Sequence, residues 1–232
     1  MGKTLFAGMA AALVASVGFC ASLSDTEKRW LKGVMPVVAF AREINLPLDI
    51  VVQPQPTPGA APLAMAFLDG RCKLVFSMRA NPEAQATLER IGPELLDAAL
   101  ELMAAHELGH CKRYLEGAWH VLPSGFVQRT SFGTSIKPEL QAAVLAMTAA
   151  RREEAFADLV GLAWIRQRHP GLYATLYEWL VKERSRDLIS GSHHDTLVWL
   201  RRVADGVALQ GRSIFAEAES VWEDGLGVEN RP

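Results

Sequence analysis

Two histidines and a glutamate stand at a spacing that suits metal chemistry. The stretch reads His106-Glu107-Leu108-Gly109-His110, with the histidines four positions apart. On a helix of about 3.6 residues per turn this spacing stacks both imidazoles on one face, where two nitrogens can bind one metal ion. Glu107, one position round, can take a proton from the water that attacks a carbonyl and deliver it to the leaving amine. The alternative is a helix with two incidental histidines, one of them buried and bonded to a backbone carbonyl.

A catalytic zinc ion normally has three protein ligands, so a further ligand must lie elsewhere. Glu116 follows His110 by six residues, where the extended H-E-x-x-H-x-x-G-x-x-H pattern has its last histidine. That pattern needs a glycine to turn the chain, but this sequence has Arg113 there. If the helix continues instead, six residues rotate by about 600° and leave Glu116 facing away from the metal. Glu116 is therefore disfavoured.

A later helix offers a better carboxylate. Glu154 and Asp158 are four residues apart and therefore share a helical face. Glu154 can complete the metal site, and Asp158, one turn on, can accept the other N–H of a ligating histidine and fix its orientation. The alternative is a solvated acidic face, with Glu153, Glu154 and Asp158 stabilised by ion pairs after Arg151 and Arg152.

H-E-x-x-H followed by E-x-x-x-D on a later helix resembles the gluzincin group of zinc metallopeptidases. The resemblance implies that Zn²⁺ is the cofactor and that Glu107 is the general base. It also implies three zinc ligands, His106, His110 and Glu154, with Asp158 hydrogen-bonded to a ligating histidine.

Residues 192–195, Ser-His-His-Asp, extend this resemblance. They are similar to the Ser/Thr-His-Pro segment of membrane-associated and periplasmic gluzincins that process or degrade envelope proteins. The resemblance gives His193 a catalytic role, hydrogen bonding to the oxyanion of the tetrahedral intermediate. His194 stands where proline is usual, which leaves the choice between the two histidines open. Alternatively, Ser192 or Asp195 only caps a helix and both histidines are exposed.

The N-terminus differs in kind from the rest of the chain. Lys3 is the only charged residue before Asp25, and residues 4–23 are dominated by Ala, Val, Leu, Phe and Gly. This pattern predicts an export signal over residues 1–23, and hence a periplasmic or secreted protein. A retained anchor that associates with the membrane is the alternative.

The composition of the chain limits the fold and the partners that can be expected for residues 24–232. Half of the 232 residues are hydrophobic, which is enough for a core, so residues 24–232 are expected to form a single zinc metallopeptidase domain. The net charge of −2 and the scattered basic residues argue against nucleic acid as a partner. Composition gives no oligomeric state. Once the signal is removed, Cys72 and Cys111 remain, either as a disulfide or as two buried thiols.

Capping residues and periodicity predict a mainly helical α+β fold with a small antiparallel sheet. Asp69-Gly70 indicates a hairpin between residues 63–68 and 72–78, after a short strand at 49–53. Loops are expected at residues 53–62 and 117–134. Helices are expected at residues 24–43, 82–90, from about 93 through the histidine motif, 138–168, 171–186, 193–209 and 212–224.

The order of helix, short sheet and active-site helix is zincin-like. In such folds an edge strand binds an extended substrate, and the 63–78 hairpin is the available candidate. Aromatic residues of the 119–132 loop either line a side-chain pocket or pack in the core, namely Trp119, Phe126 and Phe132.

These patterns favour an exported zinc-dependent endopeptidase that acts on peptides or unfolded envelope proteins. Another zinc hydrolase, such as an amidase of peptidoglycan peptides, would use the same residues, because zinc activates water against either amide. A metal-binding or chaperone-like protein without turnover is the third alternative. Glu107 argues against it, because a site without catalysis has no need of a base beside the metal.

Overall fold

A computed structural model of the chain describes residues 22–53, 60–127, 137–186 and 188–229. The predicted export signal at residues 1–23 lies outside this part of the chain except for its last two residues. Among the described residues, no helix combines the length and the apolarity needed to cross a bilayer.

The first helix begins where its cap predicts. Helix α1 spans Asp25–Glu43, and Ser24 and Glu27 form a capping box in front of it. The Ser24 side chain accepts from the Glu27 backbone N–H, while the Glu27 carboxylate accepts from the Ser24 N–H at 2.6 Å. Pro36 lies within the helix without ending it.

The small sheet is mixed, so the antiparallel prediction holds for only one of its two strand pairs. Strands β2 (Leu63–Leu68) and β3 (Arg71–Phe76) form the expected antiparallel hairpin, but β1 (Leu48–Val52) pairs with β3 in parallel. The strand order is β1-β3-β2, so β2 is an edge strand. Ion pairs support the parallel register, because Asp49 on β1 accepts from Arg71 and Lys73 on β3.

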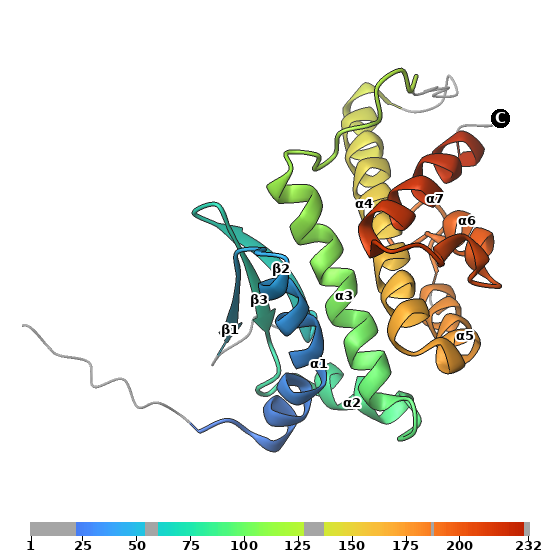
Figure 1. Cartoon of the computed structure of the whole chain (residues 1–232). Helices are drawn as coiled ribbons and strands as arrows, with labels where there is room; N and C mark the ends of the chain where they lie inside the picture. The colour runs from blue at the N-terminus through green and yellow to red at the C-terminus, as the bar shows by residue number, and fades with distance from the viewer. Residues whose placement is uncertain (1–21, 54–59, 128–136, 187, 230–232) are drawn as a thin grey trace, which may run out of the picture.

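Three further helices follow the sheet. Helix α2 covers Pro82–Arg90 behind an Asn81 cap, α3 covers Leu96–Leu115 with the histidine motif, and α4 covers Pro138–Arg168. Figure 1 shows α3 in the centre of the molecule, with α1 and the sheet on one side and α4 on the other. The site on α3 is therefore bordered from both sides.

The C-terminal third is less regular than predicted. A short 3-10 turn (Pro170–Leu172) leads into α5 (Tyr173–Ser185), and α7 (Ile214–Glu229) closes the chain. The single helix predicted at residues 193–209 is wrong. Residues 192–195 form turns, α6 covers only Leu197–Leu200, and two 3-10 turns follow at Arg201–Val203 and Val207–Leu209. Gly206, at φ +69°, adopts a left-handed conformation that a helix cannot continue through.

Helices α3 and α4 pack closely because of a glycine inside the motif. A Cβ at Gly109 would lie 3.0 Å from the Cα of Ala157, so no larger residue fits without movement. His110 directly follows Gly109 on α3, and Glu154 precedes Ala157 by three residues on α4. The close packing of the two helices therefore brings both side chains to the same interface. A disulfide between Cys72 and Cys111 ties β3 to the residue that follows His110.

Candidate metal centre

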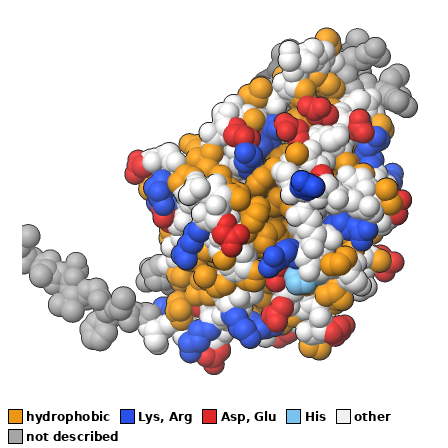
Figure 2. Space-filling model, in the orientation of Figure 1, with side chains coloured by type: hydrophobic (Ala, Val, Ile, Leu, Met, Phe, Trp, Pro, Cys, Tyr) orange, Lys and Arg blue, Asp and Glu red, His pale blue; other side chains and the backbone are white. Residues whose placement is uncertain are grey.

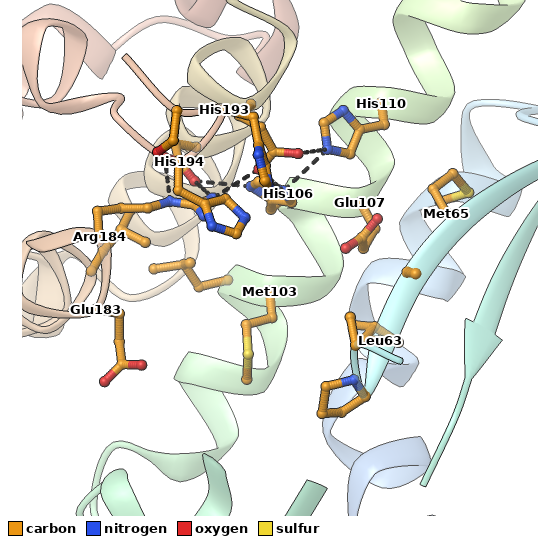
Figure 3. A pocket seen from close by; sticks show the side chains of 18 of the residues that line it. Leu63, Met65, Met103, His106, Glu107, His110, Glu183, Arg184, His193 and His194 are labelled. Atoms are coloured by element: carbon orange, nitrogen blue, oxygen red, sulfur yellow. Dashed lines mark hydrogen bonds and ion pairs between the residues drawn. The ribbon is translucent and has the colours of Figure 1, made fainter. Parts of the chain in front are cut away.

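Three side chains from two helices converge at the α3–α4 interface. His106 and His110 come from α3 and Glu154 comes from α4, and their ligand atoms lie within 4.8 Å of one another. The two Nε2 atoms are 3.1 Å apart, while Glu154 oxygens lie 3.5 Å from His106 Nε2 and 3.4 Å from His110 Nε2 (Figure 3). The predicted ligand set is therefore assembled in space, and it could hold a metal ion.

The electrostatics of Glu154 suit a ligand. Burial alone would raise the pKa of its carboxyl group, but the two histidines and Arg184 outweigh burial and hold the pKa well below its usual range. The group is therefore an anion at neutral pH, as metal binding requires.

Glu107 lies beside the cluster without belonging to it. Figure 3 shows its carboxylate between the histidines and strand β2. Burial raises the pKa of Glu107 above its usual value, although His106 and His110 act in the opposite direction. The Met65 backbone on β2 hydrogen-bonds to this carboxylate. Glu107 is thus a carboxylate of raised proton affinity held beside a potential metal site.

Asp158 is fully buried behind His106. Its Oδ1 lies 2.9 Å from His106 Nδ1, which directs the Nε2 atom of the same ring toward the cluster. Thr196 donates its hydroxyl to Asp158 Oδ2 at 2.7 Å. Burial favours the neutral acid, but Arg184 and His106 outweigh it and lower the pKa of Asp158 to about 2. The predicted partner of a ligating histidine is therefore in place and ionised.

Two residues that contact Asp158, Arg184 and Thr196, could not be predicted from the sequence. Arg184 on α5 donates to both Asp158 oxygens and to Glu154 Oε2, at 2.8, 2.6 and 3.2 Å. These residues lie 26 and 38 positions from Asp158, and no spacing rule links an arginine or a threonine to a metal ligand across such distances. Only the folded structure identifies them.

His193 and His194 both reach the cavity that contains the cluster. Their rings are 3.9 Å apart, and Figure 3 shows both close to His106 and Arg184. Burial lowers the pKa of His194, and Arg184 reinforces this effect. Both histidines therefore line the same cavity, and both remain candidates for the role that the resemblance gives to His193.

The alternative for residues 192–195 is wrong about helix capping, although both histidines are exposed, as it expected. Asp195 accepts from the Gly191 backbone N–H at 2.9 Å, within the turn that precedes α6. Thr196 is the N-cap residue of α6, and its side chain makes no capping hydrogen bond. Instead, Asp195 holds the turn that carries the two histidines.

Glu116 is not part of the group formed by His106, His110 and Glu154. It follows the last residue of α3, is half exposed and pairs with Lys112 Nζ at 2.5 Å. The solvated acidic face considered for α4 is also wrong, because Glu153 and Asp158 are 2% and 0% exposed. Arg151 and Arg152 pair with Glu229 on α7 instead.

The buried Glu153 pairs with Arg113 and holds the loop after α3. Arg113 donates to Glu153 at 2.6 Å and to the backbone oxygens of Ala118 and Val121, while Glu153 accepts from the His120 N–H. Arg113, at the position where the extended motif has glycine, thus fixes the loop.

The aromatic residues of the 119–132 loop lie in different environments. Trp119 lines the cavity, with its ring centroid 5.5 Å from that of His110. Phe126 packs against the core instead, and Phe132 lies outside the described residues. The pocket prediction therefore holds for Trp119 alone among the two residues that the structure describes.

Compared with models of protein families, with curated proteins and with solved structures, the chain gives no match.

Proposed function

We propose that the chain is a zinc-dependent endopeptidase of the gluzincin kind, with His106, His110 and Glu154 as the zinc ligands. The convergence of these three side chains on one point carries the proposal. Zn–N and Zn–O bonds of about 2.0–2.1 Å in a tetrahedral site place neighbouring ligand atoms about 3.3–3.4 Å apart. The two Nε2 atoms, 3.1 Å apart, are close to this value. Each Glu154 oxygen lies at a similar distance from one imidazole, Oε2 at 3.5 Å from His106 and Oε1 at 3.4 Å from His110, and one ligand atom from each residue falls within 4.8 Å of the others.

The donor chemistry supports zinc as well. Two imidazoles with one carboxylate form a common catalytic zinc set, which leaves a position open for the reaction. Bound zinc would supply a Lewis acid that polarises a carbonyl and acidifies water. The Asp158 contact to His106 Nδ1 leaves Nε2 of that ring free to act as the ligand.

Glu107 is the general base in this proposal. It would take the proton of the attacking water and pass it to the leaving amine. Burial raises the pKa of its carboxyl group above the usual value, and a higher pKa makes a carboxylate a stronger proton acceptor. His193, or its neighbour His194, would donate a hydrogen bond to the oxyanion that forms on the substrate carbonyl.

The substrate would be an extended peptide. Strand β2 is an edge strand, and Leu63, Ala64 and Met65 line the cavity beside Glu107. A peptide added along β2 would form main-chain hydrogen bonds there and pass in front of the metal ligands. Folded proteins rarely offer such a segment, so the proposed substrates are peptides and unfolded proteins. Together with the predicted export signal, this favours action on envelope or secreted proteins.

One experiment tests the proposal. The protein is purified, its zinc content is measured, and hydrolysis of casein is compared between wild type and Glu107→Gln. We expect about one zinc per chain in both, with activity reduced about 10²–10⁴-fold by the loss of the base. Glu116→Gln, the same change at the exposed end of α3, is the matched control and should change neither quantity.

Two results would overturn the proposal. Wild-type protein that binds no zinc would remove the metal assignment, and full activity in Glu107→Gln would remove the mechanism. A parallel assay on peptidoglycan peptides tests the amidase alternative, because an amidase would cleave those and spare casein.

A further inference from the structure

We propose that the N-terminal part of α4 is a self-association surface, on which a second copy of the chain packs in an antiparallel, two-fold pair. The surface comprises residues 140–150, which we call the α4 tip. No residue of the α4 tip lines the cavity at the metal cluster, so the pairing is independent of the proposed peptidase function.

The α4 tip projects beyond the helix that packs against the rest of α4. Gly109 on α3 lies against Ala157 of α4. One turn later on α3, Arg113 pairs with Glu153, one turn earlier on α4. The two helices are therefore antiparallel, and the end of α3 at Leu115 is level with the residue that follows the tip. At about 1.5 Å per residue, the tip continues for about 16 Å beyond that point.

Helix α7 ends at the same level as α3. Its last residue, Glu229, pairs with Arg151 and Arg152 at the base of the tip. Figure 1 accordingly shows the upper part of α4 rising past the ends of α3 and α7, with the loop that follows α3 beside it. A short helical segment with little tertiary packing is only marginally stable, so a partner would stabilise the tip.

The α4 tip is apolar on all sides. Residues 142–147 are all exposed, and six consecutive residues make more than one full turn, so every side of the helix faces solvent there. Residues 140–150 include no charged residue. Four large apolar side chains of the tip are between 39 and 53% exposed, namely Leu140, Val144, Leu145 and Met147. In Figure 2 the described surface at this end of the molecule is orange and white, and charged side chains first appear lower down. A helix that is hydrophobic all round is normally buried, which indicates a docking surface.

The side chains of the tip suit another helix better than a lipid surface. Leu140, Val144 and Met147 follow the four-three spacing by which two helices pack along a seam. Helices that lie on a bilayer carry Lys or Arg on their polar face and often Trp or Phe on the other. The tip has none of these residues, and its polar positions are Gln141 and Thr148.

A second copy of the chain offers a helix of the right kind. In a two-fold pair the same patch faces itself, which an uncharged surface tolerates and a charged one does not. A parallel pair would bring both wide bases to the same end, where they collide, whereas an antiparallel pair places them at opposite ends. The axis then passes near Val144, and Leu140 faces the partner's Met147.

The antiparallel arrangement also covers apolar residues at the base of the tip. Val121 and Val228 are exposed there, next to the ends of α3 and α7. Each tip reaches the base of the other copy, so the contact extends beyond the two tips. It remains at the small end of protein interfaces, which predicts a weak dimer with a Kd on the order of 10 µM.

The test is sedimentation equilibrium of the purified protein from about 1 to 200 µM, a range that brackets the expected Kd. Val144→Glu and Val144→Lys each place like charges at the axis. Val207→Glu, the same change at an exposed valine outside α4, is the matched control. Thermal unfolding checks that every variant folds.

We expect wild type and Val207→Glu to dimerise with the same Kd, and each Val144 variant to weaken the dimer by at least about 10-fold. An equimolar mixture of Val144→Glu and Val144→Lys should dimerise again, because opposite charges then meet at the axis. A mixture of Leu140→Glu with Met147→Lys should also associate, since only antiparallel pairing places these positions opposite each other. A general folding defect would not be rescued by mixing.

Several results would overturn the proposal. Wild-type protein that stays monomeric throughout the range would remove the dimer, and a dimer that survives both Val144 substitutions would lie elsewhere. Variants that do not recover in either mixture would exclude the antiparallel pair. Monomeric wild type that sediments with vesicles of phosphatidylcholine and phosphatidylglycerol, when Val144→Glu does not, would assign the α4 tip to the bilayer instead.

Discussion

Arg184 and Asp158 form a bidentate ion pair directly behind the imidazole of His106. Arg184 Nε donates to Asp158 Oδ2 at 2.8 Å, and Arg184 Nη2 donates to Asp158 Oδ1 at 2.6 Å. The same guanidinium reaches Glu154 at 3.2 Å. One arginine from α5 therefore orients both a proposed ligand and the partner of another ligand. Its planar fork matches two carboxylate oxygens in a way that lysine cannot.

Arg184→Met should weaken zinc binding and peptidase activity by about 10–100-fold, the usual cost of losing a group that orients metal ligands. Arg184→Lys should recover only part of the loss, because one ammonium cannot contact both Asp158 oxygens in the same geometry. Zinc affinity is measured by competition with a chelator, and thermal unfolding checks that the variants fold. Arg202→Met, which removes a partly exposed partner of Asp224, is the control and should change neither quantity. Undiminished zinc affinity in Arg184→Met would show that Arg184 does not position the ligands.

The export prediction concerns residues outside the described part of the chain. If residues 1–23 are a signal, the mature protein should be found in the envelope or outside the cell, with a new N-terminus near residues 21–25. N-terminal sequencing of the fractionated protein is the measurement. An intact Met1 would contradict cleavage, and a requirement for detergent would indicate a retained anchor.

Local signals made several helices predictable from the sequence. Ser24, Asn81 and Pro138 mark the starts of α1, α2 and α4, because capping and N-terminal proline act within a few residues of the chain. The Asp69-Gly70 turn likewise identified the β2–β3 hairpin, because both residues adopt positive φ there. The parallel pairing of β1 with β3 could not be predicted, because it joins strands across a loop and depends on non-local contacts.

The contrast between local signals and non-local contacts also explains the outcome at the site and the wrong prediction of one helix at residues 193–209. Helical spacing predicted that His106 and His110 share one face of α3 and that Glu154 and Asp158 share one face of α4. Spacing within each helix does not bring the two helices together, so the expectation that Glu154 joins the histidines depended on the resemblance to gluzincins. In residues 193–209 the apolar periodicity favoured one helix, but tertiary contacts prevailed. Asp158 holds Thr196 just before α6, the Trp199 indole donates to the Trp222 backbone, and Gly206 turns the chain.

The Cys72–Cys111 disulfide should contribute strongly to stability, because it closes a separation of 39 residues between β3 and α3. Chain entropy alone gives about 4 kcal/mol for such a loop. In a protein of this size, that corresponds to a fall in Tm of roughly 8–16 °C after reduction. Unfolding of wild type is compared with and without dithiothreitol, and the Cys72→Ala/Cys111→Ala double variant is the control whose Tm should not respond to the reductant. An unchanged wild-type Tm in dithiothreitol would show that the bond does not stabilise the fold.

The final prediction separates the two candidate carboxylates, because the gluzincin assignment depends on the third ligand. Glu154→Ala removes one of three converging donors, so zinc affinity and activity should both fall steeply. Glu116→Ala removes only an exposed partner of Lys112 and should leave both nearly intact. Asp158→Ala should be intermediate, with a loss of about 10–100-fold, because His106 and its fellow ligands remain.

Stability must be followed in the same variants, since Glu154 also pairs with the buried Arg184 and a general loss of structure would mimic the loss of a ligand. Glu154→Gln keeps the size of the side chain while weakening it as a ligand, so it should reproduce the loss of zinc with less destabilisation. The informative comparison is zinc affinity between variants of equal Tm. A folded Glu154→Ala protein that still binds zinc tightly, together with a Glu116→Ala protein that does not, would transfer the third ligand to Glu116. The gluzincin assignment would then be withdrawn.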